Sequence, residues 1–301
     1  MRDYITSFFE EFEYERADRV ALAIAYEKIA ESKKARDKLL ALISGYERDN
    51  AFIKLESRPE VEAIATAAGI HPYTAILLTV ICLSRTLRAR LAAIGIPKKV
   101  IYNTLCDFKY KLNECKTVHG VVGTEHFDWY VRFFELRLFA IGRLQFQLKA
   151  YSGDSYEKDG KRLREGDRVL AVHIPDNSTP LEERACNQAF RDAKKLFCAL
   201  LKISDIPFIC SSWLLYPKNR EFLPEKSNIV KFMNKFDLIS TANYRKDNNT
   251  AIPFLFHVKK STPTELLPRG TSLQRAYAGH LMNGGKMGYG VGVMFVEEKN
   301  G

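Results

Sequence analysis

The chain has 301 residues, of which 46% are hydrophobic and 27% are charged. This composition is typical of a soluble globular protein, and the length predicts two domains of ordinary size. The longest apolar run, residues 74–83, is about half of the ~20 residues that a membrane-spanning helix needs. Length and composition therefore exclude membrane-spanning, collagen-like and disordered classes, and we expect no membrane partner.

The first residues and the cysteines indicate the cellular compartment of the protein. Residues 1–16 are acidic, whereas a secretory signal begins with a cationic region that an apolar stretch follows. The 6 cysteines form no CxxC pair, which is typical of reduced thiols rather than of a disulfide framework. We therefore expect a cytoplasmic protein.

The net charge of +10 is spread along the chain, with +4 before residue 151 and +6 after it. An even excess is typical of a solubilised surface, although it also favours anionic partners such as nucleic acid or a phosphorylated cofactor. A nucleic-acid-binding protein concentrates positive charge on one element, so nucleic acid is the less favoured partner.

Residues 1–140 have the spacing of helices throughout. Apolar residues recur three and four positions apart, and Pro59, Gly69, Pro72 and Pro97 mark breaks between the segments. The expected helices include residues 20–29, 39–46, 60–68, 73–88, 100–112 and 127–141. No strand is expected in this part of the chain.

After Gly142 the apolar period changes from 3.6 to 2, which predicts a half-buried strand. Further strands are expected at residues 168–174, 207–215, 237–244, 252–258 and 289–296, and helices at 180–201, 226–236 and 272–282. The fold class is therefore α+β. An all-helical domain, residues 1–140, precedes a mixed-sheet domain, residues 141–301.

The order of these elements resembles the GNAT superfamily of N-acyltransferases. Asn228, Phe232 and Phe236 follow one another at spacings of four, which puts them on one helix face, as in the last common helix of that fold. The whole chain also resembles a bacterial two-domain family with a helical N-terminal domain and a GNAT-like C-terminal domain. The matching stretches are GRLQF (142–146), VHIP (172–175), SSWLL (211–215), LP (223–224) with SNI (227–229), and TSLQRA (271–276).

This resemblance implies transfer of an acyl group from acetyl-CoA or another acyl-CoA to an amine or hydroxyl acceptor. In that fold the strands expected here at 168–174 and 207–215 separate and accept the pantetheine arm, and a backbone N–H polarises the thioester carbonyl. The helical domain would then serve as a lid, or as a platform for a small-molecule or peptide acceptor.

Transfer to an amine needs a base for the amine and an acid for the departing thiolate. His173 is the candidate base, and Cys210, Ser212 and Tyr216 are the candidate acids. The candidate cofactor-binding residues are Ile174, Asn177, Ser178, Ser211, Trp213 and Asn228. Structural interpretations compete with these roles: a hydrogen-bonded strand histidine, a small core cysteine, and a helix cap that Asn228 shares with Ser227.

The loop before the helix expected at 180–201 departs from the family pattern. The GNAT signature there places Arg or Gln, two residues, Gly, one residue and then Gly or Ala, so that backbone N–H groups bind a pyrophosphate. The sequence PDNSTPLEE (175–183) has no glycine and no arginine. Thr179 and Glu182 fit a capping box around Pro180, and two glutamates add negative charge. The alternative function is therefore a non-catalytic binding or regulatory module.

Several further patterns indicate structure more than function. The glycine-rich residues 283–292 follow a helix instead of preceding one, which predicts a helix end and a closing strand rather than a phosphate loop. Cys115, His119 and His126 lack a second pair of ligands, so we expect no metal site. Residues 92–103 fit a turn between helices or, less well, a helix-turn-helix. A Ser-His-Asp hydrolase is disfavoured because the chain has no G-x-S-x-G element.

Overall fold

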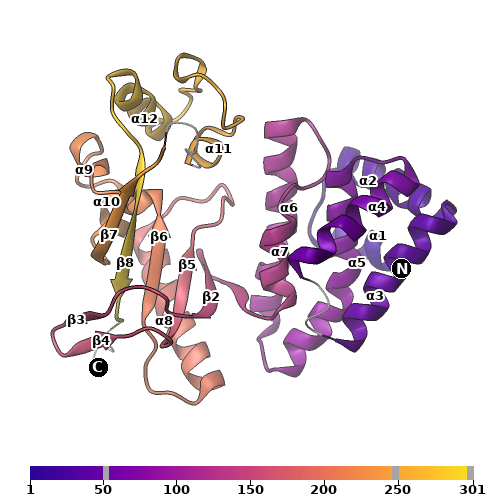
Figure 1. The fold of residues 1–301 in the computed structure, drawn as a ribbon, viewed down its shortest axis with the longest axis horizontal. Coiled ribbons are helices and arrows are strands. Elements are labelled where there is room, and N and C mark those ends of the chain that lie inside the picture. Colours follow the sequence, from indigo (N-terminus) through magenta and orange to yellow (C-terminus); the bar gives the residue numbers. More distant parts are fainter. Residues whose placement is uncertain (50–53, 246–250, 297–301) are drawn as a thin grey trace. The chain divides into compact units, whose positions relative to one another are not determined.

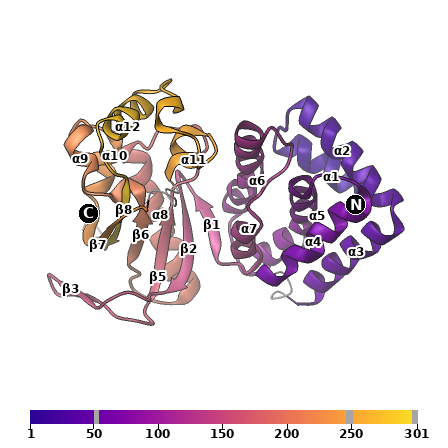
Figure 2. The same cartoon turned by 45° about the horizontal axis from the view of Figure 1, so that its top comes forward.

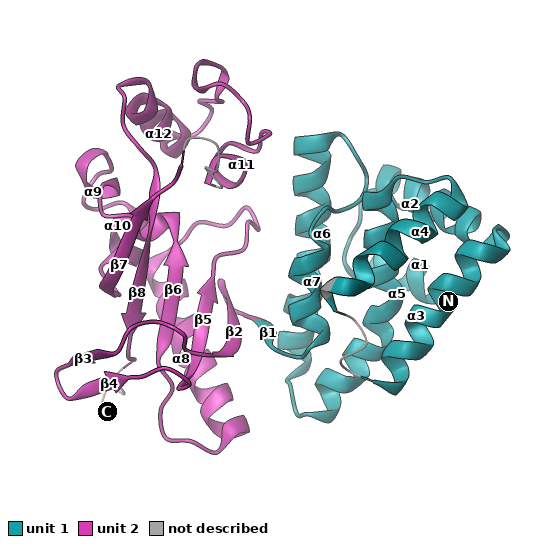
Figure 3. Cartoon of the chain, viewed as in Figure 1, with its two compact units in different colours: residues 1–139 teal, residues 140–301 magenta. Residues whose placement is uncertain are grey.

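The computed structural model describes residues 1–49, 54–245 and 251–296 (Figure 1). The chain forms two compact units, residues 1–139 and residues 140–301 (Figure 3). The first unit is helical and the second is built on a mixed sheet, so the α+β class is confirmed.

The helical unit is organised around one buried helix. Its elements are α1 (Arg2–Glu11), α2 (Arg16–Glu31), α3 (Lys33–Arg48), a 3₁₀ turn (Leu55–Ser57), α4 (Arg58–Ala68), α5 (Pro72–Ala93), α6 (Lys98–His119) and α7 (Phe127–Phe134). The central helix, α5, packs against α1, α2, α3, α4, α6 and α7 (Figure 2). Every residue from Thr74 to Ser84 is buried, which explains why this stretch has no polar face.

The helices α4 and α5 test the expectation that no segment spans a membrane. Among the described residues, no single helix is both long and apolar enough to cross a membrane. These two helices pass that test only as a pair, and the chain bends by 114° between them. Gly69, with a φ of 63°, ends α4, and Pro72 begins α5 after a turn in which His71 Nδ1 accepts a hydrogen bond from the Tyr73 N–H at 3.1 Å.

The sheet unit contains a six-stranded sheet in the order β1-β2-β5-β6-β8-β7 and a separate β3–β4 hairpin. Its strands are β1 (Leu138–Ile141), β2 (Leu144–Ala150), β3 (Tyr156–Lys158), β4 (Lys161–Leu163), β5 (Arg168–His173), β6 (Phe208–Ser212), β7 (Asp237–Asn243) and β8 (Gly288–Met294). Its helices are α8 (Glu183–Leu201), α9 (Asn219–Phe222), α10 (Asn228–Met233), α11 (Ala251–Phe256) and α12 (Ser272–Met282), with 3₁₀ turns at Trp213–Leu215 and Thr264–Leu266.

Each face of the sheet has its own apolar cover. On one face, Phe146 of β2 and Phe208 of β6 pack against Phe190 of α8, with ring centroids 5.8 and 5.2 Å from it. On the other face, Val169 and Val293 form a buried cluster with residues from the β3–β4 region. Because side chains alternate along a strand, each side chain of β5 and β6 lies either on the face covered by α8 or on the face of the Val169–Val293 cluster.

Two expectations about individual elements were wrong. The helix expected at 127–141 ends at Phe134, because Leu136 takes a left-handed φ of 55° and the four buried residues that follow form β1. The strand expected at 252–258 is replaced by α11, in which Ile252, Leu255 and Phe256 are buried at helical spacing. A short apolar run cannot by itself distinguish a buried strand from a buried helix.

Candidate acyl-donor site

The strands β5 and β6 run parallel and separate towards their C-terminal ends. They pair only at Leu170 with Phe208 and at Ala171 with Ile209. Beyond these pairs, β5 continues beside β2 to His173, and β6 continues beside β8 to Ser212. Each strand is thus held by its outer neighbour, while its inner edge no longer pairs with the other strand. This is the separation that the resemblance to GNAT proteins implied.

The inner edge of β5 presents backbone groups to the gap. Leu170 donates its N–H to the Pro207 carbonyl at 3.0 Å, so this N–H points towards β6. Because backbone groups alternate along a strand, the N–H of Val172 lies on the same edge and is used where Ala171 pairs with Ile209. The next N–H on this edge, that of Ile174, lies at the open end. An edge of this kind can pair with an extended ligand that carries amide groups.

The loop between β5 and α8 makes a left-handed turn without a glycine. Ser178 has a φ of 59°. The side chain of Asn177 supports the turn, because its Oδ1 accepts hydrogen bonds from the Thr179 N–H at 3.2 Å and from the Thr179 hydroxyl at 2.7 Å. The glycine-free loop therefore reaches a backbone conformation that usually requires glycine.

The capping box expected at Thr179 and Glu182 is not formed. The helix α8 begins at Glu183 with Glu182 as its N-cap residue, and no described side chain accepts a hydrogen bond from its first turn. Thr179 lies too early in the chain to cap this helix and binds Asn177 instead. The first intrahelical bond runs from the Cys186 N–H to the Glu182 carbonyl, so the N–H groups of residues 183–185 remain available to an anion.

One carboxylate near this helix start is paired with a cation, and another lies near a histidine. Glu183 Oε1 lies 3.2 Å from the Lys235 ammonium, and Asp176 Oδ2 lies 3.5 Å from His257 Nδ1. The negative charge that the sequence places here is thus opposed locally, although such exposed pairs are weak. The second contact also links the loop to the end of α11.

Arg143 holds the loop between β5 and α8 through that loop's carbonyl groups. This role was not predicted from the sequence. The Arg143 guanidinium donates hydrogen bonds to the carbonyls of Pro175 at 3.0 Å, Thr179 at 2.9 Å and Pro180 at 3.1 Å. No described peptide bond is cis. A trans peptide directs its N–H opposite to its carbonyl, so the N–H groups of residues 176 and 181 point away from Arg143. The available signal was the stretch GRLQF, which carries this arginine directly after the turn at Gly142.

His173 lies at the open end of β5, on the same face of the sheet as Gln147. Its Nε2 is 3.1 Å from Gln147 Oε1. This distance permits a hydrogen bond whose direction depends on the tautomer of the imidazole. Gln147 thus helps to hold the ring at the open end of β5.

Cys210 and His173 are not brought together. Cys210 alternates with Ser211 along β6 and lies on the face of Phe208, which is covered by α8, whereas His173 lies on the opposite face. Cys210 is 0% exposed, and burial raises the pKa of its thiol to about 12. These surroundings are those of a small core residue.

The other candidates on the β6 side serve partly structural roles. The Ser212 hydroxyl caps the following 3₁₀ turn by accepting from the Leu214 N–H at 3.1 Å, while Ser211 is exposed. Trp213 packs edge-on against the Tyr277 ring, at 5.4 Å. Tyr216 is 5% exposed, burial raises the pKa of its hydroxyl, and that hydroxyl donates a hydrogen bond to Asn243.

Asn228 opens α10, and the cap of that helix is Ser227. The Ser227 hydroxyl accepts a hydrogen bond from the Val230 N–H at 3.3 Å. The Asn228 side chain is therefore not needed as the cap, and it is exposed. The cofactor-binding role expected for Asn228 stays a prediction, as do those of the loop and β6 residues.

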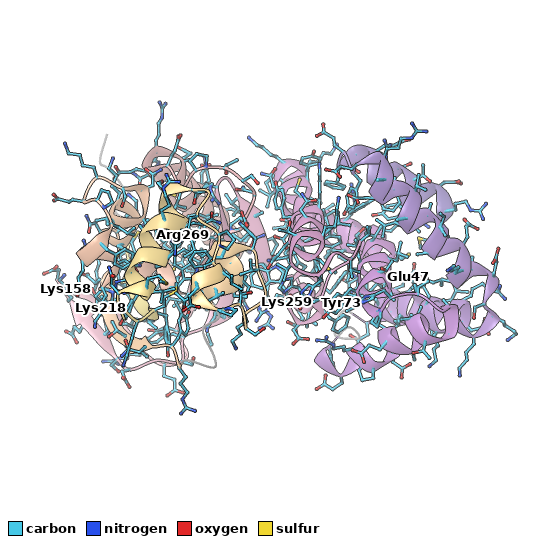
Figure 4. The ribbon with its side chains drawn as sticks, turned by 90° about the horizontal axis from the view of Figure 1, so that it is seen from above. Glu47, Tyr73, Lys158, Lys218, Lys259 and Arg269 are labelled. Carbon is cyan, nitrogen blue, oxygen red and sulfur yellow. The ribbon has the colours of Figure 1, made fainter. Side chains whose placement is uncertain are left out.

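The connection between β7 and β8 lies at the open end of the gap in its described parts, residues 244–245 and 251–287. It leaves β7 at Asn243 and enters β8 at Gly288, beside the end of β6. Figure 1 shows its helices α11 and α12 beyond the C-terminal ends of β5 and β6. Figure 4 looks onto this connection, with its exposed cations Lys259 and Arg269 labelled.

The weaker sequence patterns have ordinary structural explanations. α12 ends at Met282 with Asn283 as its C-cap, and the glycine-rich stretch continues into β8, as predicted. A short turn joins α5 to α6. In the described residues, no group of three or more His, Cys, Asp or Glu side chains could hold a metal ion.

Comparison with known protein families gives two matches that follow the two units. Residues 3–136 match an N-acyltransferase N-terminal domain, and residues 138–294 match a GNAT-like C-terminal domain. A comparison with curated proteins finds no match.

Several solved structures have the same fold over nearly the whole chain. One is an acyltransferase in complex with decanoyl-CoA and teicoplanin, which is 22% identical with a TM-score of 0.75 and is covered over 87% of its length by 97% of this chain. Another is an acyltransferase in complex with CoA and 10C-teicoplanin, at 21% identity, a TM-score of 0.75 and the same coverage. A third is an acyltransferase mutant in complex with octanoyl-CoA, at 21% identity and a TM-score of 0.73, in which 98% of this chain covers 88% of that one.

Proposed function

The chain belongs to the family that joins an N-acyltransferase N-terminal domain to a GNAT-like C-terminal domain, and from this premise we propose that it is an acyl-CoA-dependent N-acyltransferase. It would move an acyl group from CoA to an amine or a hydroxyl group. The observation that carries this proposal is the separation of β5 from β6 next to the uncapped start of α8.

The donor would be held mainly by backbone groups. The pyrophosphate fits the N–H groups at the start of α8, where the helix dipole favours an anion. The pantetheine arm carries amides, which suit the unpaired edges of β5 and β6 near Ile174 and Ser211. The loop at Asn177 and Ser178 would close around the phosphates, and Arg143 keeps that loop in shape.

The acceptor would lose its proton to His173. Its Nε2 lies 3.1 Å from Gln147 Oε1, a contact that would orient the imidazole. A thioester supplies an activated carbonyl, and backbone N–H groups at the gap would stabilise the negative charge that develops on its oxygen. Among the candidate acids, Cys210 is disfavoured because it is buried on the face opposite His173, while Ser212 and Tyr216 stay candidates.

We further propose a small-molecule or peptide acceptor and a cytoplasmic setting. Two structural neighbours hold teicoplanin or 10C-teicoplanin together with a CoA ligand, which supports a sizeable acceptor. The 6 cysteines form no disulfide, which supports a reducing compartment.

Thermal unfolding with acetyl-CoA, decanoyl-CoA and free CoA tests donor binding. A ligand at ~100 times its Kd stabilises the native state by about 2.7 kcal/mol, which raises Tm by several degrees. Arg143→Gln should abolish this shift because the loop loses three hydrogen bonds to its carbonyls. Arg162→Gln, on the exposed β3–β4 hairpin, removes the same charge and should keep it.

The second candidate, a non-catalytic binding module, has lost one of its two supports and keeps the other, the absence of glycine and arginine from residues 175–183. It also rested on a capping box at Thr179 that would occupy the N–H groups of the helix, and the structure does not contain that box. It would regain support if none of the three CoA ligands shifted the Tm of the unaltered protein.

A further inference from the structure

A groove in the helical unit lies between α1 and α2 and has no role in the proposed function. It has a volume of about 390 Å³. Ile5 and Phe9 of α1, each 3% exposed, belong to its floor, and Val20, Ala23 and Tyr26 of α2 line it from the other side. This volume lies in the range of small-molecule sites, about 300–1,000 Å³.

The apolar surface at this groove is open rather than packed. Val20 is 52% exposed and Ile24, one turn later on the same helix, is 56% exposed. Apolar residues on the outer face of a helix are unremarkable singly, but here they adjoin a concave apolar surface. An apolar chain that binds in the groove would therefore be removed from water together with these side chains.

One end of the groove carries two arginines without acidic partners. Arg16 and Arg19 line it at the first turn of α2, and neither guanidinium is in an ion pair among the described residues. The neighbouring carboxylates of Glu15 and Asp18 are each 2.9 Å from the Lys116 ammonium instead. The three cations and two carboxylates here leave one net positive charge, and the helix start adds to it.

The opposite end is closed by a matched pair. Arg2 of α1 binds Glu27 of α2, and both residues line the groove. Glu27 lies eleven residues after Arg16, which corresponds to about 16 Å along a helix. The groove is therefore polar and cationic at one end, apolar along its length and neutral at the other end.

We propose that this groove binds a free carboxylate with a medium-length alkyl chain. The carboxylate would pair with Arg16 and Arg19, whose planar guanidinium groups suit bidentate binding. The alkyl chain would lie along Val20 and Ala23 towards the Arg2–Glu27 pair. A second protein is a poorer fit, because a specific protein interface buries about 1,200–2,000 Å².

Isothermal titration of the full-length protein with decanoate tests this inference. Arg16→Gln with Arg19→Gln should weaken decanoate binding at least 10-fold, and Val20→Asp should weaken it similarly by placing a charge on the apolar wall. Lys34→Gln with Arg48→Gln removes two charges from exposed positions of α3 and should leave the Kd unchanged. Arg143→Gln should also leave it unchanged, which separates this groove from the proposed acyl-donor site.

Three further ligands define the chemistry. Acetate and decanol should each bind much more weakly than decanoate, since one lacks the chain and the other lacks the charge. Vesicles of phosphatidylglycerol test whether the arginines bind lipid headgroups instead. The inference is overturned if decanoate does not bind, if the double arginine variant binds it normally, or if the vesicles bind and decanoate does not.

Discussion

Two helices of the sheet unit begin in opposite ways. At α12, the Thr271 hydroxyl accepts from the Gln274 N–H at 3.1 Å, and Gln274 Oε1 accepts from the Thr271 N–H at 3.2 Å, which completes a capping box. At α8, no described side chain caps the first turn. The N–H groups at the start of α8 are therefore open to a ligand, as the proposed acyl-donor site requires.

The largest expected effect concerns chemistry at the α8 end of the sheet. His173→Ala should lower kcat by about 10²- to 10⁴-fold, because the proposed base is removed, and should leave the Kd for acyl-CoA within about two-fold. Stopped-time assays of acyl transfer and calorimetry measure the two quantities separately. His280→Ala, on α12, is the matched control and should keep the rate. A normal rate for His173→Ala would remove this histidine from the reaction.

Acid should destabilise the helical unit through Glu114. Glu114 contacts Lys111 at 2.6 Å and His126 at 3.2 Å, and these partners outweigh its burial and lower its pKa to about 2. A carboxyl whose pKa falls on folding stabilises the protein above its ordinary pKa of 4.5 and loses that contribution as the pH falls towards 2.

Glu114→Gln should therefore reduce the free energy of unfolding by about 3 kcal/mol at pH 7, since each pKa unit corresponds to about 1.4 kcal/mol. The difference from the unaltered protein should shrink as the pH falls from about 5 to about 2. Denaturant titrations across this range measure it. A difference that stays constant with pH would mean that packing rather than charge accounts for the loss.

A cap added to α8 should stabilise the protein and weaken donor binding together. Glu182→Ser places a hydroxyl at the N-cap position, where it should add about 0.5–1 kcal/mol and occupy an N–H group that the pyrophosphate needs. Glu182→Gln removes the same charge without a strong cap and should strengthen acyl-CoA binding. Equal or tighter binding by Glu182→Ser would contradict the assignment of these N–H groups.

The smallest expected effect compares two threonines. Thr271→Ala should destabilise the protein by about 1 kcal/mol, because α12 loses its cap, and should leave acyl-CoA binding unchanged. Thr179→Ala should cost less stability, because Thr179 caps no helix, but should weaken acyl-CoA binding by loosening the turn at Asn177. Chemical denaturation and calorimetry of both variants measure these effects, and the reverse ranking would restore the capping box at Thr179.

The two helix starts also show which features could be predicted from the sequence and which could not. α12 was predicted with its observed bounds, because its capping residues are local in sequence. The same reasoning misplaced the start of α8, since Asn177 competes for Thr179 and a pattern alone does not show which bond forms. Arg143 was missed because its three carbonyl partners are more than thirty residues away. Cys210 and His173 were both candidates because the resemblance places their strands on either side of the gap, but strand alternation puts them on opposite faces.

Hydrogen exchange of backbone amides, with and without decanoyl-CoA, tests the central claim most directly. We predict slower exchange in peptides that cover residues 174–186 and 208–212, and no change in peptides that cover the start of α12 at residues 270–276. Protection confined to other segments, or equal protection at the starts of α8 and α12, would contradict the assignment of the open helix start and the β5–β6 gap as the acyl-donor site.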